Sequence, residues 1–207
     1  ADLVLRPIGF EPTDIRSRLT EALTAAREAE KSGDIEGAIM ELERARTLVP
    51  KSAIPDFHLA RLDFARGEND RALEEATSAT SKSPDCADCW VLQARIERSL
   101  GHPDEARNCV ERALKVAPDF SPACGISGVL LYESKFHEEA LAWLETAVAA
   151  GDPDPNVHLY LANSYMVLRR PGPATDGDRS YLERFPDAPN RDQVERVLTA
   201  LSDTGVP

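Results

Sequence analysis

The residues with the most distinctive chemical spacing are the four cysteines of this 207-residue chain. Cys86 and Cys89 form a CxxC pair at the expected start of a helix, where backbone amides can lower the pKa of a thiol. Cys109 and Cys124 fall on expected facing helices, on either side of a turn. Three interpretations stay open: buried or incidental thiols, structural or redox disulfides, and a metal site. Disulfides in both pairs would indicate an exported protein.

Other residues that could do chemistry do not form a known site. Zinc needs further ligands, and the chain has no second CxxC and no HxxxH, so we expect no metal. Its four histidines are scattered along the sequence (His58, His102, His137 and His158). The sequence Gly125-Ile126-Ser127-Gly128 suggests a nucleophile turn, but close helix packing explains its glycines better. We therefore expect no enzyme and no cofactor.

Small residues recur along the chain with a period of 34. One ladder is Ala38, Ala72, Ala106, Ala140 and Ala174; a second is Ala26, Ala60, Ala94, Gly128 and Ala162; a third is Ala45, Ala79, Ala113 and Ala147. Gly33, Gly67 and Gly101 follow the same period, as do Pro50, Pro84, Pro118 and Pro186. Ala and Gly allow two helices to approach closely, Gly ends a helix, and Pro stops the next one. This periodicity is typical of a two-helix solenoid repeat.

The residues that fit best, Trp90, Ala94, Ala106, Val110, Ala113 and Pro118, resemble the tetratricopeptide repeat pattern. The resemblance implies an all-α, right-handed superhelical solenoid of antiparallel helix pairs. Its five repeats are Leu19–Ser52, Ala53–Cys86, Ala87–Phe120, Ser121–Asp154 and Pro155–Ala188. Repeat four has Lys135 in place of the helix-ending glycine. The second helix of repeat five should start late and fray, because Pro171, Gly172 and Pro173 precede it.

Two segments flank the five repeats. Residues 1–18 carry apolar residues without a helical period, and we expect an extended segment or a linker. Residues 189–207 contain an amphipathic stretch, Asn190–Ser202, with apolar residues at Val194, Val197, Leu198 and Leu201. We expect this stretch to form a helix that covers the apolar end of the last repeat.

The charge of the chain limits its partners. A net charge of −12 argues against general nucleic-acid binding and against anionic membrane surfaces. No apolar run approaches the ~20 residues that span a bilayer, so we expect no membrane insertion. The compartment stays open.

The resemblance also implies a binding groove on the concave face, lined by the first helix of each repeat. The equivalent arginines Arg27, Arg61 and Arg95 then lie in line. The other groove positions that we expect are Phe57, Phe64, Val91, Arg98, Tyr132, Leu159, Asn163 and Met166. Guanidinium groups suit carboxylates, although Arg27 could instead pair with Glu30 on its own helix. The family's Lys/Asn clamp for chaperone tails has no match here, since Leu23, Arg27 and His58 occupy its positions.

The sequence therefore predicts a non-catalytic protein–protein interaction scaffold. Its partner would be a protein or peptide segment, acidic and with apolar anchors, held in the groove. Two alternatives stay open. One is a structural unit that assembles into homo-oligomers, and the other is a thiol redox or metal protein that uses Cys86 and Cys89.

Overall fold

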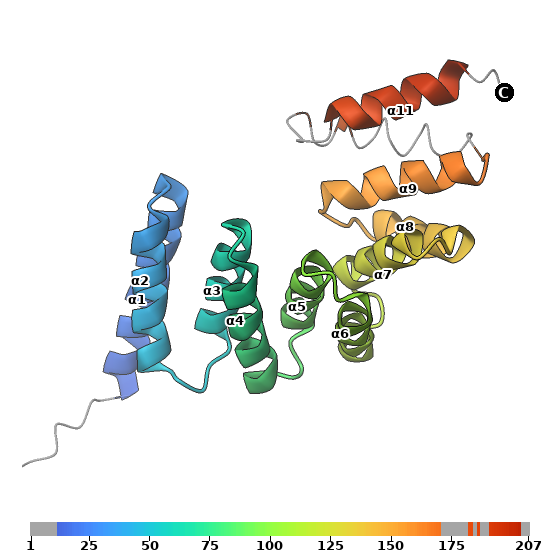
Figure 1. Cartoon of the computed structure of the whole chain (residues 1–207). Coiled ribbons are helices and arrows are strands. Elements are labelled where there is room, and N and C mark those ends of the chain that lie inside the picture. The colour runs from blue at the N-terminus through green and yellow to red at the C-terminus, as the bar shows by residue number, and fades with distance from the viewer. Residues whose placement is uncertain (1–11, 171–181, 184–185, 187–190, 204–207) are drawn as a thin grey trace, which may run out of the picture. The chain divides into compact units, whose positions relative to one another are not determined.

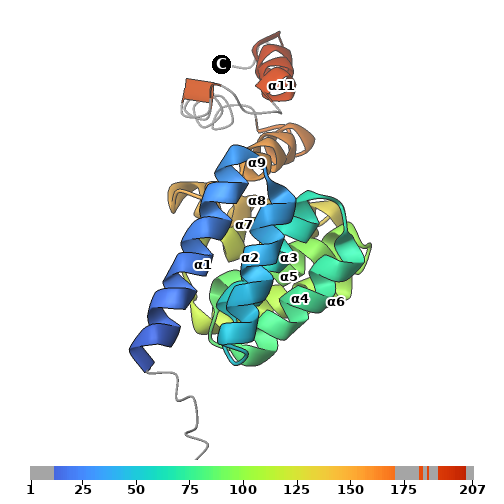
Figure 2. The ribbon, with the colours of Figure 1, turned by 90° about the vertical axis from the view of Figure 1, so that its left-hand side faces the viewer.

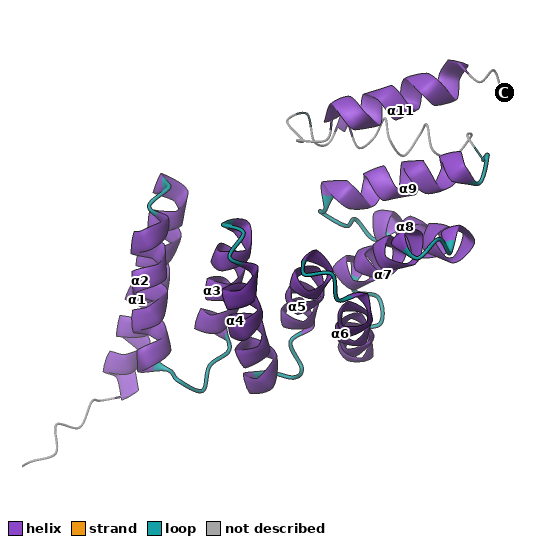
Figure 3. Ribbon diagram, in the orientation of Figure 1, coloured by secondary structure: helices purple, strands orange, loops and turns teal. Residues whose placement is uncertain are grey.

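The structure is a computed structural model that describes residues 12–170, 182–183, 186 and 191–203. These residues form helices joined by turns and loops, with no strand among them (Figure 3). The chain divides into two compact units, Ala1–Pro84 and Asp85–Pro207, which we call unit 1 and unit 2.

Unit 1 contains two helix pairs, and in each pair the two helices lie side by side (Figures 1 and 2). Its helices are α1 (Pro12–Ser32), α2 (Ile35–Leu48), α3 (Ile54–Ala65) and α4 (Asn69–Lys82). The first helix begins at Pro12 and not at Leu19, so the expectation of an extended segment is wrong for residues 12–18. Proline suits a first helical turn, because the N–H that it lacks would have no partner there.

Unit 2 contains two helix pairs and two further described helices. Its helices are α5 (Ala87–Ser99), α6 (Pro103–Val116), α7 (Ser121–Glu133), α8 (His137–Ala149), α9 (Pro155–Val167) and α11 (Arg191–Asp203). The expected terminal helix is present as α11, and it contacts α9 and buries Val194 completely. The start of the second helix of repeat five, expected to be late, lies outside the described residues, which include only 182–183 and 186 of this stretch; residues 1–11 and Asn190 also lie outside them.

The alanine ladders lie where the helices of a pair cross. Ala38, Ala72, Ala106 and Ala140 have no exposed surface, and neither do Ala45, Ala79, Ala113 and Ala147. Gly128 shows how tight these crossings are: a Cβ atom there would lie 2.5 Å from Cγ of Leu144. Real Cβ atoms do not approach other atoms so closely, so this crossing requires glycine. The 34-residue period therefore marks the packing contacts within each helix pair.

The turn inside each helix pair uses one residue in the left-handed region of backbone conformation. Gly33, Gly67 and Gly101 adopt φ values of 81°, 80° and 82°. Lys135 occupies the equivalent position in repeat four with φ 70°. Glycine adopts this conformation without penalty, whereas a residue with a Cβ atom does so at a cost. The turn geometry is thus kept in repeat four despite an unfavourable residue.

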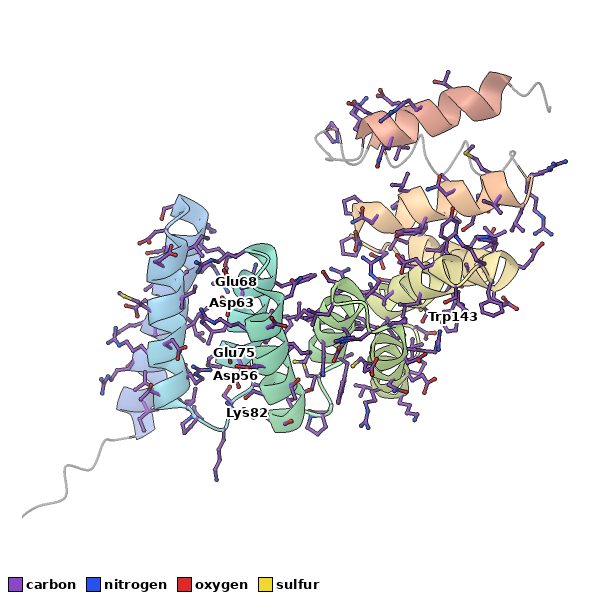
Figure 4. The ribbon with its side chains drawn as sticks, viewed as in Figure 1. Asp56, Asp63, Glu68, Glu75, Lys82 and Trp143 are labelled. Atoms are coloured by element: carbon purple, nitrogen blue, oxygen red, sulfur yellow. A yellow bond between two sulfur atoms is a disulfide. The ribbon has the colours of Figure 1, made fainter. Side chains whose placement is uncertain are left out.

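Unit 1 buries charged side chains that the sequence analysis missed (Figure 4). Asp56, on α3, has no exposed surface and pairs with Lys82 of α4, while Ser78 Oγ donates a hydrogen bond of 3.1 Å to its carboxylate. Asp63, further along α3, is also fully buried and lies 3.6 Å from a guanidinium nitrogen of Arg71. These two ion pairs join α3 to α4.

Candidate functional site: the first-helix faces

The first helices of the pairs form the surfaces on which the candidate groove residues lie. In unit 2, α5 contacts α7 and α7 contacts α9, so these three helices form one layer, which we call the α5–α7–α9 face. In unit 1, residues of α1, α2 and α3 line a cavity of about 200 Å³, which we call the α1–α3 pocket. These are two sites, one in each unit.

Arg61 forms the main ion pair of the α1–α3 pocket. Its two terminal nitrogens bind the two carboxylate oxygens of Glu30 at 2.6 Å each. This hydrogen bonding lowers the pKa of Glu30 below its ordinary value. Two parallel bonds between a guanidinium and a carboxylate make a strong and directional contact between α1 and α3. The expected pairing of Arg27 with Glu30 is not observed, because Glu30 binds Arg61 instead.

Arg27 is therefore the guanidinium that the α1–α3 pocket leaves available. It is exposed, it lines the pocket, and among the described residues it forms no ion pair. His58 lies in the same pocket, and burial, with a smaller contribution from Arg61, lowers the pKa of its imidazole. His58 is thus mainly neutral at pH 7, and Arg27 supplies the uncompensated positive charge.

Apolar side chains line the same pocket, and Phe57 packs on its histidine. The ring of Phe57 meets that of His58 edge to face, with centroids 5.4 Å apart. Leu23 is half-buried in the pocket wall, and Ile54, also in the wall, is 50% exposed. Phe64 is half-buried on the same helix as Phe57. Within the described part of unit 1, the pocket therefore offers a free cation beside apolar surface.

Arg95 is held by an ion pair in unit 2. A terminal nitrogen lies 2.9 Å from a carboxylate oxygen of Asp154, which also caps α9 by accepting a hydrogen bond from the Asn156 amide. The contact links α5 to the start of α9, two repeats further along the chain. Arg95 thus positions a neighbouring helix.

Arg98 belongs to a second cluster on the α5–α7–α9 face. Its Nη1 lies 2.8 Å from Oε1 of Glu133, and the hydroxyl of Tyr160 donates to the same oxygen at 2.8 Å. The rings of Tyr132 and Tyr160 meet edge to face, with centroids 5.2 Å apart. One side chain from each of α5, α7 and α9 therefore meets at Glu133. The sequence analysis missed Glu133 and Asp154, although each lies on or beside a first helix.

The remaining groove candidates differ in exposure. Val91 is only 6% exposed and belongs to a core cluster with Ala94 and Ala106, so the expectation that it lines an open groove is wrong. Leu159 and Asn163 are half-buried on α9. Met166 is 38% exposed near the end of α9. The accessible part of the α5–α7–α9 face therefore consists of tyrosines, paired charges and the α9 side chains Leu159, Asn163 and Met166.

The four cysteines fall into two classes. Cys86 and Cys89 form a disulfide at the start of α5. Cys109 and Cys124 are free and buried, and they belong to different core clusters. The second disulfide that the sequence left open is therefore not formed.

The described residues contain no arrangement typical of a catalytic or metal site. No group of three or more His, Cys, Asp or Glu side chains within them could hold a metal ion. A Cβ atom at Gly125 would lie 2.6 Å from Oδ2 of Asp152, and Gly128 packs on Leu144, so both glycines serve helix packing. None of the helices in the described segments is long and apolar enough to cross a membrane.

Comparison with known families identifies the repeat. Two models described as tetratricopeptide repeat match residues 29–96 and 91–155, which together span more than half of the chain. The chain belongs to the tetratricopeptide repeat family. The alanine ladders and the left-handed turns are thus the packing and turn positions of a tetratricopeptide array. No curated protein sequence matches the chain.

Solved tetratricopeptide structures share the fold. A thermophilic tetratricopeptide protein from Thermus thermophilus is 21% identical, with a TM-score of 0.71 over 87% of this chain and 99% of that chain. PilW, described as a widely conserved type IV pilus biogenesis factor, is 22% identical, with a TM-score of 0.72 over 87% of this chain and 86% of that chain. PilF from Pseudomonas aeruginosa is 13% identical, with a TM-score of 0.70 over 90% of this chain and 83% of that chain.

One structural neighbour contains an enzyme. A mutant O-GlcNAc transferase from Thermobaculum terrenum is 21% identical, with a TM-score of 0.58, and the match covers 65% of this chain but 27% of that one. At these identities the likeness shows the fold alone. Tetratricopeptide arrays generally serve as protein-interaction scaffolds, and the fold indicates that role here.

Proposed function

We propose that this tetratricopeptide protein is a non-catalytic scaffold whose first-helix faces bind a segment of a partner protein. The observation that supports it best is the α1–α3 pocket, where Arg27 has no ion-pair partner among the described residues. An open, positively charged pocket on a chain with a net charge of −12 favours an acidic segment, which the rest of the chain repels. The exposed side chain of Ile54 offers apolar contact beside this charge.

The partner segment should combine a carboxylate with an apolar anchor. The carboxylate would bind Arg27, because Arg61 is already saturated by Glu30. The anchor would cover Ile54 and the half-buried Leu23. Charge complementarity would mainly set the orientation and the rate of association, and the apolar contact would supply much of the affinity.

The paired arginines have a different role in this proposal. Arg95 and Arg98 hold the first helices of unit 2 in register through Asp154 and Glu133. An acidic ligand would have to displace these carboxylates before it could use either arginine. The acidic part of the partner therefore binds unit 1, and unit 2 contributes tyrosine and aliphatic contacts.

The test starts from a random peptide library displayed against the whole chain. Sequences that bind should be enriched in Asp or Glu beside an apolar residue, and their affinity should fall as salt rises. Arg27→Ala should weaken their binding by roughly tenfold, because a desolvated charge pair is lost. Calorimetry measures the affinity.

The matched control is Arg44→Ala. Arg44 is an exposed arginine on α2, a second helix of the same unit, and it pairs with Glu41 of its own helix. Both substitutions change the net charge equally. If Arg27→Ala and Arg44→Ala reduce affinity by the same amount, binding depends on general charge and the proposed site is wrong.

A further inference from the structure

The cysteines of unit 2 differ in how accessible they are to a thiol reagent. Cys86 is half-buried at the N-cap of α5, whereas Cys89, bonded to it, is 2% exposed one turn into the helix. Cys109 and Cys124 are 6% and 1% exposed. Burial raises the pKa of the Cys109 thiol to about 11, and burial also raises that of Cys124. The two free thiols are therefore inert in the folded protein, because a thiolate is the reactive form.

The start of α5 is built to hold Cys86 in either redox state. The Cys89 backbone N–H donates a hydrogen bond to Cys86 Sγ at 3.1 Å, so the sulfur acts as the N-cap acceptor. If the disulfide opens, the same amide can bind the Cys86 thiolate, and the positive end of the helix dipole favours that charge. Asp85 precedes the pair and Asp88 lies between the two cysteines, and their negative charges oppose this effect.

We propose that Cys86 and Cys89 form a reversible thiol–disulfide site that exchanges with low-molecular-weight thiols of the glutathione class. The proposal goes beyond the scaffold function and does not depend on it. It rests on the bonded pair, the unequal exposure of its two sulfurs, and the N-cap geometry.

The exchange proceeds in two balanced steps. The thiolate of an external thiol attacks Cys86 Sγ, the bond between the two sulfurs of the protein breaks, and Cys89 leaves as a thiolate that takes up a proton. A second external thiolate then attacks the external sulfur of the mixed disulfide. The bond to Cys86 Sγ breaks, and Cys86 leaves as a thiolate that takes up a proton. Two external thiols are oxidised to one disulfide, and the protein disulfide gains two electrons and two protons.

Opening the bond should act locally. The disulfide closes a loop of only a few residues, so it removes little entropy from the unfolded chain, and both redox states should stay folded. What changes is the first turn of α5, which loses a covalent link between its N-cap and its third residue. We expect faster amide exchange in that turn, directly beside the boundary between the units at Pro84 and Asp85.

The experiment titrates the full-length native chain with glutathione redox buffers. Each sample is quenched, free thiols are alkylated before and after denaturation, and peptides are read by mass spectrometry. We expect Cys86 to be alkylated without denaturant in reducing buffer, and to be protected in oxidising buffer and again after the reduced protein is reoxidised. In the reduced protein the buried Cys89 should be alkylated only after denaturation. Cys109 and Cys124 should be alkylated only after denaturation. A pair that is reduced only in denaturant would overturn the proposal, because it would be a structural disulfide.

Two single variants test which sulfur is attacked. Cys89→Ser leaves the half-buried Cys86, which should form a stable mixed disulfide with glutathione. Cys86→Ser leaves the buried Cys89, which should form little. Equal adducts on both variants would contradict the assigned order of attack. Hydrogen exchange of the oxidised and reduced wild type gives the second readout: faster exchange confined to the first turn of α5 supports the proposal, and identical exchange there counts against it.

Discussion

Replacing Asp152 with asparagine should stabilise unit 2 at neutral pH. Asp152 lies in the turn between α8 and α9 and has no exposed surface. Its Oδ1 accepts a hydrogen bond of 2.8 Å from the Asp154 amide, but its buried Oδ2 has no hydrogen-bond partner among the described residues. Burial raises the pKa of this carboxyl from 3.8 to about 6. The fold therefore favours the neutral carboxyl over the carboxylate.

The size and the sign of the effect follow from this shift. One pKa unit corresponds to about 1.4 kcal/mol, so a rise from 3.8 to about 6 corresponds to about 3 kcal/mol. A raised carboxyl pKa means that the native state binds the proton more tightly than the unfolded state does. The contribution of Asp152 to stability is therefore greatest below pH 4, falls as the pH rises to about 6, and stays low above it.

Asparagine cannot ionise, and its side-chain oxygen can still accept from the Asp154 amide. The free energy of unfolding of Asp152→Asn should exceed that of the wild type by up to about 3 kcal/mol at pH 7, less the cost of burying an unpaired amide group. At pH 4 the two proteins should be nearly equal.

The assay is urea unfolding between pH 4 and pH 8, followed by tryptophan fluorescence. Both tryptophans of the chain, Trp90 and Trp143, lie in unit 2, so the signal reports that unit alone. The difference between variant and wild type isolates Asp152 from the other titrating groups. A difference that does not change between pH 4 and pH 7 would refute the reasoning.

Three further substitutions, and a control for the last one, test a buried ion pair, the packing and the turns. Lys82→Met removes the ion pair of the buried Asp56 with Lys82 and leaves it the hydrogen bond from Ser78 and a longer contact of 3.8 Å to Arg46. It should lower the free energy of unfolding by up to about 3 kcal/mol, measured by urea unfolding followed by circular dichroism, and no change would mean that the Lys82 contact does not stabilise the fold. Ala106→Leu should cost roughly 1–3 kcal/mol, because no space exists at that helix crossing, and an unchanged tryptophan-detected midpoint would contradict the repeat register. Lys135→Gly should gain up to about 1 kcal/mol by relieving the left-handed backbone, whereas glycine at Ser134, where φ is −78°, should destabilise the protein.

Most of the fold could be predicted because it depends on contacts that repeat. Each crossing of two helices needs a small residue at a fixed position, so Ala106 and its equivalents reveal both the period and the register. The left-handed turn also depends on one residue at a fixed repeat position. Gly33 and its equivalents predict it, and repeat four keeps the turn with Lys135 in place of glycine. The start of α1 was missed because a proline in a first helical turn is indistinguishable, in one sequence, from a proline in a linker.

The candidate site was less predictable because its pairings are not periodic. The equal spacing of Arg27, Arg61 and Arg95 indicated three equivalent groups, but Arg61 and Arg95 are compensated by carboxylates at unrelated repeat positions. The buried Asp56 was missed for the same reason: it occupies the repeat position that Trp90 holds in the next repeat, and its contacts with Lys82, Ser78 and Arg46 explain it. Polar pairs, within a repeat as well as between repeats, depend on three-dimensional contacts that the repeat pattern does not encode.

The most direct test of the central claim is to map where a selected peptide binds on the full-length chain. A photo-crosslinker placed beside the acidic residue of the peptide, followed by mass spectrometry, identifies the contacted side chains. We predict crosslinks to α1 and α3 around Arg27 and Ile54, and their loss in the Arg27→Ala variant at equal peptide concentration. Crosslinks confined to the second helices α2, α4, α6 and α8 would contradict the account, because the partner would then bind the opposite layer of the helix pairs.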